Sequence, residues 1–191
     1  MALILASTSE SRRELLGRLQ IPFDCANPGV DEAAWKERPL TPSQLAQELA
    51  LAKARAIVDR FPGADVLGGD QVCECDGQLF GKPGTEAAAV DQLRQLAGKT
   101  HRLWTAVCLI HRDAPWQMIT TTALTMRPLS DEEIHRYVRH DQPLFCAGSY
   151  KIESLGIALF ERIETPDSTA IMGLPLMALA QQLRVCGYSI P

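Results

Sequence analysis

Short apolar runs bounded by turn residues alternate along the chain with longer segments of helical periodicity. Three of the short runs predict strands, at 3–6, 23–26 and 64–67, and the last of these is expected to be buried. Segments 41–61 and 85–96 predict helices, because each begins at a Thr that can cap a helix. The apolar stripe of the first of these helices comprises Leu45, Leu49, Ala52, Ala56 and Ile57. Lys53 is expected at the surface, beside the edge of this stripe.

Two hairpins are predicted further along the chain. Asp76-Gly77 is a strong two-residue turn signal, so 72–75 and 78–80 are expected to pair. The β-rich segments 100–111 and 116–127 predict a long antiparallel hairpin. A helix is expected after Ser130 to about Arg139, a strand at 157–163, and a last helix after Gly173-Leu174-Pro175.

Composition excludes several classes of protein. The 191 residues suit one domain, or one with a lobed insertion, and 46% hydrophobic residues are typical of a globular chain. A formal net charge of -4 argues against broad binding to nucleic acid or to anionic lipid. No apolar run reaches membrane-spanning length, and the apolar start at 1–6 is interpreted as a strand and not as a signal peptide.

The six cysteines are scattered and predict no zinc site. Cys73 and Cys75 fall on one face of a strand, but no second pair completes a metal-binding set. We expect buried thiols in a reducing cytosol, and hence a cytoplasmic protein. The four histidines also lack the spacing of metal ligands, and each is expected at the surface.

The stretch Gly68-Gly69-Asp70-Gln71 contains the main candidate catalytic residue. The strand at 64–67 is expected to end at the two glycines, which let the backbone bend and let another group approach closely. Asp70 is then expected at the edge of the sheet, facing solvent. Ligands of open α/β sheets lie beyond the carboxyl ends of strands, so Asp70 is a candidate catalytic residue. A plain turn residue is the alternative interpretation.

The segment after the first strand is typical of an anion site. Ser9 is a suitable N-cap, and Arg12 and Arg13 fall in the first turn of the following helix, where basic side chains oppose the helix dipole. A bound phosphate chain would remove that conflict, because the hydroxyls of Ser7 and Ser9 and the free backbone N–H groups would also donate to it. The alternative is an ordinary cap with solvated arginines.

Two further positions are candidates for phosphate chemistry. Glu32 follows a turn and an adjacent acid, and carboxylate oxygens suit Mg²⁺, although solvated acids are the alternative. Lys82 follows the hairpin at 72–80, which is expected to bring its ammonium near Asp70, although a surface turn is the alternative.

The stretch 145–156 mixes small residues, an aromatic, a lysine and an acid. Glu153 is expected to accept hydrogen bonds from the edge of a nucleobase, and Tyr150 to pack on the base. An ordinary passage from loop to strand with a salt bridge is the alternative interpretation.

Taken together, these segments resemble the Maf family of nucleotide pyrophosphatases over nearly the full length. The matching motifs, in chain order, are Ser7-Thr8-Ser9-Glu10-Ser11-Arg12-Arg13, Val30-Asp31-Glu32, Ala52-Lys53-Ala54, Gly69-Asp70-Gln71, Gly81-Lys82-Pro83, Ala147-Gly148-Ser149-Tyr150 and Gly173-Leu174-Pro175. The resemblance implies an α/β fold of the Maf/ITPase-like type, with a mixed, strongly curved central sheet flanked by helices. It also implies one domain over 1–191 with two lobes around a cleft.

The resemblance further implies a cytoplasmic hydrolase that cuts a nucleoside triphosphate between its α and β phosphates. It implies a divalent cation, Mg²⁺ or Mn²⁺, held by Asp70 and Glu32, and in many members a homodimer. Asp70 would activate the attacking water. The triphosphate would be bound by Ser7, Ser9, Arg12, Arg13, Lys53 and Lys82.

Within the family, the motifs around Gln71 and Glu153 look like the branch acting on 7-methyl-GTP. Ser11, Gln71 and Glu153 stand at the positions linked to base choice. Ser11 and Ser154 depart from that branch, where an aromatic and a glycine are usual. Hydrolysis of dTTP or UTP, or a nucleotide-sensing inhibitor of division with incidental turnover, are the alternatives.

Overall fold

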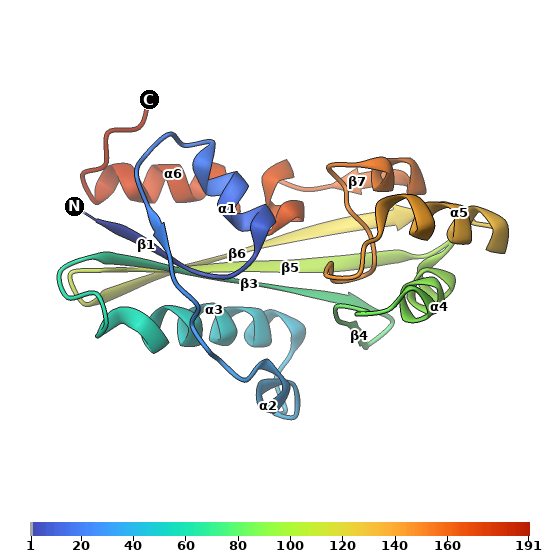
Figure 1. The fold of residues 1–191 in the computed structure, drawn as a ribbon, viewed down its shortest axis with the longest axis horizontal. Helices are drawn as coiled ribbons and strands as arrows, with labels where there is room; N and C mark the ends of the chain where they lie inside the picture. Colours follow the sequence, from blue (N-terminus) through green and yellow to red (C-terminus); the bar gives the residue numbers. More distant parts are fainter. Residues whose placement is uncertain (1) are drawn as a thin grey trace. The chain divides into compact units, whose positions relative to one another are not determined.

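Seven strands form one mixed sheet in the computed structural model, which describes residues 2–191 (Figure 1). The strands are β1 (Leu3–Ala6), β2 (Asp24–Cys25), β3 (Asp65–Cys75), β4 (Gln78–Phe80), β5 (Thr100–His111), β6 (Ala114–Met126) and β7 (Phe160–Glu164). Their order is β2-β1-β3-β5-β6-β7, and β4 pairs with β3. Strand β1 runs parallel to β2 and β3, whereas the pairs β3–β4 and β6–β7 are antiparallel.

Six α-helices and two short 3₁₀ helices accompany the sheet within the described part of the chain, residues 2–191. They are α1 (Glu10–Gly17), α2 (Glu32–Lys36), α3 (Pro42–Val58), α4 (Glu86–Leu96), α5 (Asp131–Asp141), α6 (Leu176–Val185), η1 (Leu155–Leu159) and η2 (Ser168–Met172). The predicted α/β class with a mixed sheet is confirmed. Within residues 2–191, no helix combines the length and the apolar character that crossing a bilayer requires.

The chain divides into two compact units. Unit 1 comprises the residues up to Gln71, Thr105–Thr120 and Asp167–Pro191, and unit 2 comprises Val72–Trp104 and Thr121–Pro166. The organisation of 1–191 as one domain with two lobes stays a prediction.

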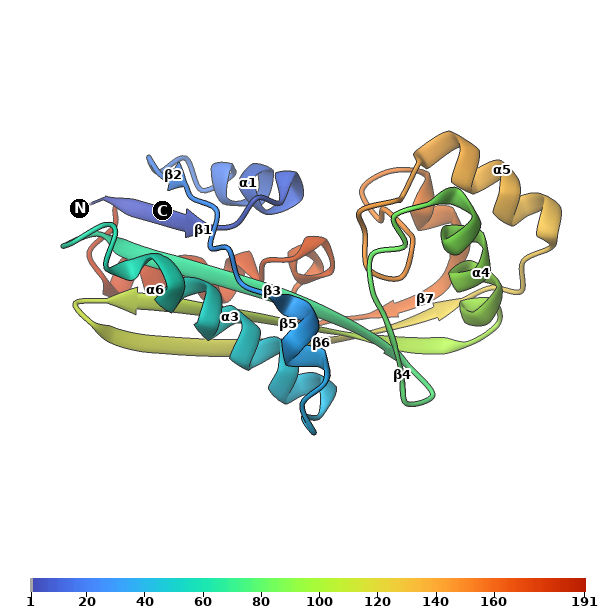
Figure 2. The same cartoon turned by 60° about the horizontal axis from the view of Figure 1, so that its bottom comes forward.

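The core of unit 1 has two layers, one on each face of its strands. Alternate strand residues, such as Leu5 and Leu67, pack with apolar residues of α1 and α6. On the other face α3 buries Leu49, Ala50 and Ile57, and Figures 1 and 2 show it running along these strands. Thr41 forms a capping box with Gln44 at the start of α3, as the sequence predicts. Ala56, assigned to the apolar stripe, is exposed.

Strand β3 is longer than the sequence predicts. The glycines at 68 and 69 do not end it, and the strand continues to Cys75, where the turn Asp76-Gly77 leads into β4 as expected. Its first residue, Asp65, is buried. The Asp65 carboxylate accepts hydrogen bonds from His111 Nδ1 and from the Tyr188 hydroxyl, each at 2.8 Å.

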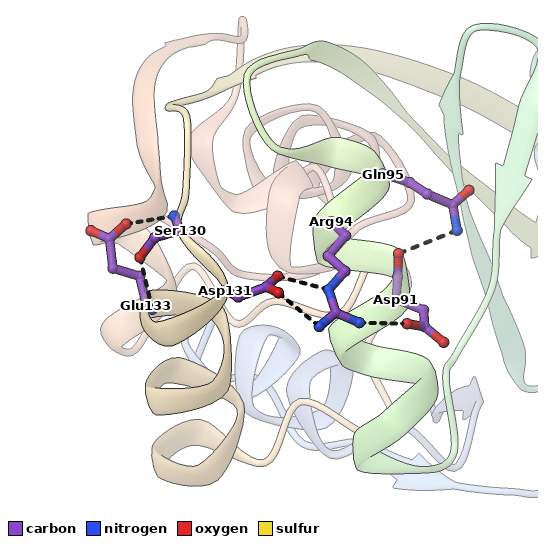
Figure 3. Close-up of polar contacts among 6 residues, drawn as sticks. All are labelled: Asp91, Arg94, Gln95, Ser130, Asp131 and Glu133. Carbon is purple, nitrogen blue, oxygen red and sulfur yellow. Dashed lines mark hydrogen bonds and ion pairs between the residues drawn. The ribbon is translucent and has the colours of Figure 1, made fainter.

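Helices α4 and α5 belong to unit 2 and pack against each other. Arg94 of α4 donates from Nε and Nη2 to the two oxygens of Asp131, at 2.8 and 3.2 Å, and so joins the two helices (Figure 3). Ser130 and Glu133 form a capping box at the start of α5. The strand predicted at 157–163 is partly wrong, because η1 occupies 155–159 and β7 begins at Phe160.

Candidate active site

A buried carboxylate and a buried ammonium group lie in direct contact in unit 1. Lys53 Nζ, from α3, is 2.6 Å from Asp70 Oδ1 of β3 and 2.6 Å from Glu32 Oε1 at the start of α2. The side chains of Lys53 and Asp70 are each 7% exposed, whereas that of Glu32 is 40% exposed. Lys53 is therefore not the surface residue that the sequence predicts, and Asp70 does not face solvent as a turn residue. Two candidate carboxylates, Asp70 and Glu32, thus converge on the ammonium group of a third candidate, Lys53.

The two glycines before Asp70 allow close packing from both faces of β3. A Cβ on Gly68 would lie 2.1 Å from the backbone oxygen of Ala50, so α3 approaches the strand at a distance that only glycine permits. A Cβ on Gly69 would lie 3.3 Å from Leu174 Cδ2 and 3.5 Å from Arg12 Nε on the other face. The close approach predicted for these glycines is therefore confirmed, whereas the prediction that the strand ends at them is wrong, because β3 continues to Cys75.

Strand β1 ends before it reaches the level of Asp70. Pairing between β1 and β3 ends at Ala6 and Gly68. Residues 69–71 therefore lie past the carboxyl end of β1, where ligands of parallel sheets bind. The chain then enters α1, whose N-cap Ser9 accepts from the Arg12 backbone N–H at 3.4 Å, while Ser7 Oγ accepts from the Ser9 N–H at 3.1 Å. The predicted Ser-rich turn and cap are present.

The two arginines of α1 differ in their surroundings. Arg12 is half-buried and donates from Nε to the carbonyl of Gly173 at 3.2 Å, and its charge acts on Asp70. Arg13 has a 60% exposed side chain, which lies 3.7 Å from Glu10. Ser11, between Glu10 and Arg12, is half-buried. The structure thus brings Arg12 and Lys53 to Asp70, whereas Arg13 pairs at the surface.

Burial raises the pKa of Asp70 above the ordinary value of an Asp. The positive charges of Lys53 and Arg12 oppose that rise, and the Lys53 hydrogen bond opposes it further, whereas Glu32 adds to it. A carboxylate in such surroundings is a stronger base than one in water, which suits it to accept a proton from water.

Gln71, the next residue of β3, is held by groups that the sequence does not indicate. Its Nε2 donates toward Thr105 Oγ1 at 2.9 Å and toward the carbonyls of Ala170 and Ile171 at 2.9 and 3.0 Å. Thr105 is fully buried, and Ala170 and Ile171 belong to η2. No local pattern marks Thr105, because its role depends on strands and a loop that are distant in sequence.

The remaining candidates belong to unit 2. Lys82 and Glu153 are exposed. Burial is the main cause of a raised pKa of the Cys146 thiol, and the charges of Lys82, Glu153 and Lys151 also act on this thiol. These two predicted residues therefore share one neighbourhood of unit 2. Their roles stay predictions.

Tyr150 and His101 lie in the interior of unit 2, which contradicts two expectations. Tyr150 is 5% exposed and packs edge-on against Phe160, so it has no face available to a base. His101, expected at the surface, is 1% exposed, and its Nε2 lies 2.9 Å from the Tyr150 hydroxyl. Burial lowers the pKa of His101 to about 4.

A surface cavity of about 490 Å³ in unit 1 lies elsewhere. Its lining includes Phe61, Asp65 and His111, at the beginning of β3 and the end of β5, and does not include Asp70. It is therefore separate from the candidate active site.

The acidic residues beside Lys53 suit a hard divalent cation. Asp70 and Glu32 already direct one oxygen each toward the positive charge of Nζ, and Mg²⁺ prefers such oxygens in small number together with water and phosphate. Within residues 2–191, no cluster of three or more His, Cys, Asp or Glu side chains is arranged as a metal site. The donor set thus fits a cation that takes most of its ligands from water and substrate.

Comparison with known proteins identifies the family. The model of the family described as Maf-like protein matches residues 2–186. This chain belongs to the Maf family. A relative from Xanthomonas campestris pv. campestris named 7-methyl-GTP pyrophosphatase is 51% identical over 190 residues, covering 99% of this chain and 98% of that protein. A protein of the same name from Polaromonas sp. is 47% identical over 190 residues, covering 98% and 86% of the two chains.

Solved structures show the same fold at low sequence identity. A HAM1 protein from Coxiella burnetii has a TM-score of 0.54 at 16% identity, covering 97% of this Maf chain and 99% of that chain. The Ham1 protein of Staphylococcus aureus has a TM-score of 0.53 at 11% identity, covering 96% and 100%. The Maf assignment and the predicted ITPase-like architecture thus agree.

Proposed function

We propose that this Maf protein hydrolyses a nucleoside triphosphate between its α and β phosphates, and that 7-methyl-GTP is its preferred substrate. The observation that supports this reaction is the buried Asp70 carboxylate, whose Oδ1 lies 2.6 Å from Lys53 Nζ. The positive charge of Arg12 acts on the same carboxylate, which lies past the end of β1. The full-length relatives at 51% and 47% identity named 7-methyl-GTP pyrophosphatase support the choice of substrate.

In this mechanism Asp70 orients a water molecule and takes its proton. The water oxygen forms a bond to the α-phosphorus as the bond from phosphorus to the bridging oxygen breaks, and pyrophosphate leaves. Arg12 and Lys53 bind phosphate oxygens and stabilise the charge of the leaving group, with the backbone N–H groups at the start of α1. Arg13, Lys82, Ser7 and Ser9 are proposed to contribute to binding the triphosphate.

Asp70 and Glu32 would hold the divalent cation, Mg²⁺ or Mn²⁺. When bound, the cation supplies positive charge to phosphate oxygens. Ser11, Gln71 and Glu153 are proposed to select the base, and the Glu153 carboxylate suits the positive charge of 7-methylguanine.

The test is pyrophosphate release from a panel of 7-methyl-GTP, GTP, dTTP, UTP, ATP and CTP with Mg²⁺. We expect one nucleotide, 7-methyl-GTP, to be hydrolysed far faster than the others. Asp70→Asn should lower kcat by about 10²–10⁴-fold, the usual contribution of a general base, with little change in nucleotide affinity. The matched control is Asp59→Asn, an exposed acid of unit 1, which should retain full activity.

An Asp70→Asn variant that stays active would show that another group is the base. Tight nucleotide binding with negligible turnover would support a nucleotide sensor instead. Faster hydrolysis of dTTP or UTP would keep the reaction and change the substrate.

A further inference from the structure

The hydrogen bonds around Gln71 determine which end of its amide is available to a ligand. Backbone carbonyls can only accept, so the group facing Ala170 and Ile171 must be the NH₂ group of Gln71. Thr105 indicates the same orientation of the Gln71 amide. Its hydroxyl donates its single proton to the carbonyl of Ala170 at 2.9 Å, so the hydroxyl oxygen can only accept a hydrogen bond from Gln71. A rotated amide would place its carbonyl oxygen against two other carbonyls.

The carbonyls that hold Gln71 are themselves fixed. Asp167, 5% exposed, accepts at Oδ1 from the backbone N–H and the hydroxyl of Thr169, at 2.9 and 2.6 Å, and at Oδ2 from the Met177 N–H at 2.9 Å. Thr169 Oγ1 in turn accepts from the Leu176 N–H at 2.9 Å. The segment 167–177 is therefore tied at both ends, and the orientation of the Gln71 amide is set before any ligand binds.

The same segment also positions Arg12. Gly173 follows η2, and its carbonyl accepts from Arg12 Nε at 3.2 Å. Side chains of a strand alternate between faces, so Gln71 lies on the face of Gly69, whose Cβ position is 3.5 Å from Arg12 Nε. One backbone segment thus fixes a cation suited to phosphate and an amide beside it.

We infer that Gln71 presents its carbonyl oxygen, and not its NH₂ group, to the nucleobase, and that Thr105 is the positioning residue that keeps it so. This inference rests on the proposed function. An acceptor at this place matches bases whose ring nitrogen carries a hydrogen, namely guanine, 7-methylguanine, uracil and thymine. Adenine and cytosine present an unprotonated ring nitrogen there, and two facing acceptors leave both without a hydrogen-bond partner, which disfavours these two bases.

The experiment compares 7-methyl-GTP with 1,7-dimethyl-GTP, in which the ring N–H is replaced by N–CH₃. We measure kcat/KM for both with the wild type and with Gln71→Leu, Thr105→Val and Thr105→Ser. We expect the wild type to prefer 7-methyl-GTP by at least about 10-fold, the factor for one lost hydrogen bond. Gln71→Leu removes the acceptor at similar size and should reduce this preference several-fold.

Thr105→Val keeps the shape of the buried side chain and should also reduce the preference, whereas Thr105→Ser should restore it. A role of Thr105 in folding alone would lower the unfolding temperature without changing the ratio of the two substrates. The inference is overturned if wild type and Thr105→Val show equal preferences, or if the wild type does not distinguish the two nucleotides.

Failure of the proposed function has a different signature. It would appear as no pyrophosphate release by the wild type from either nucleotide. In that case calorimetry measures the dissociation constants of 7-methyl-GTP and 1,7-dimethyl-GTP. Equal constants for the two nucleotides, or no binding of either, would overturn the inference.

Discussion

Lys53 and Asp70 form an ion pair with 2.6 Å between Nζ and Oδ1, and both side chains are almost fully buried. Removing one partner leaves an uncompensated charge in the interior. We expect Lys53→Met to lower the free energy of unfolding by about 3–5 kcal/mol, the usual cost of breaking such a pair. Urea unfolding followed by circular dichroism measures the change.

The matched control is the double variant Lys53→Met/Asp70→Asn. Neither charge is then left alone, so the double variant should be more stable than Lys53→Met. A double variant that is less stable than Lys53→Met would contradict the pairing.

The pH profile of kcat/KM reports the protonation of Asp70. Only the carboxylate can accept a proton from water, so activity should rise with pH through the pKa of Asp70. Burial raises this pKa, so the midpoint of the acidic limb should lie above 3.8, the unperturbed value. Arg12→Gln removes a charge that lowers the pKa, and should therefore move the midpoint to higher pH. Arg13→Gln, in an exposed pair with Glu10, should leave the midpoint unchanged.

His101 should make the stability of the protein depend on pH in the acidic range. Its pKa is lowered from 6.5 to about 4 in the folded state, so the unfolded chain binds a proton first as the pH falls. The contribution of the neutral His101 ring to the free energy of unfolding is complete above pH 6.5 and is lost between pH 6.5 and 4. At 1.36 kcal/mol per pKa unit, this contribution amounts to about 3 kcal/mol. Chemical unfolding at a series of pH values measures it.

A His101→Phe variant provides the comparison for this pH dependence. It removes the titrating ring. The unfolding free energy of the wild type minus that of the variant should therefore decrease as the pH falls. A difference that stays constant from pH 7 to pH 4 would show that His101 does not titrate in this range.

The close approach of α3 to β3 makes Gly68 intolerant of any side chain. A Cβ there would lie 2.1 Å from a backbone oxygen, which cannot move without moving the helix. We expect Gly68→Ala to destabilise the protein by about 3 kcal/mol or more, the upper range for overpacking. Gly17→Ala is the control, because its Cβ would meet nothing within 4 Å, and it should be neutral or slightly stabilising. Thermal unfolding of both variants decides the point.

Features that depend on neighbours in sequence were predictable. Ser9, Thr41, Thr85 and Ser130 each cap the helix that follows them, and Asp76-Gly77 makes the turn between β3 and β4. These interactions form within four residues, so a short pattern contains all the information they require.

Features that depend on distant partners were not predictable from local pattern. Lys53 has the charge of a surface residue, and its burial is explained by its contacts with Asp70, 17 positions away, and with Glu32. The two glycines inside β3 are explained by their neighbours, α3 on one face and Leu174 on the other, which are distant in sequence. Gln71 was recognised as a candidate, but the orientation of its amide depends on residues up to 100 positions away.

The hydrogen bond from Tyr188 to Asp65 ties the carboxyl-terminal residues to the first position of the strand that holds Asp70. A deletion that removes Tyr188 would leave a buried carboxylate with one donor fewer, only five positions before the proposed base. Changes to the carboxyl-terminal residues can therefore affect the strand that holds the proposed base. Affinity tags placed after Pro191 should be joined through a linker that preserves the hydrogen bond from Tyr188 to Asp65.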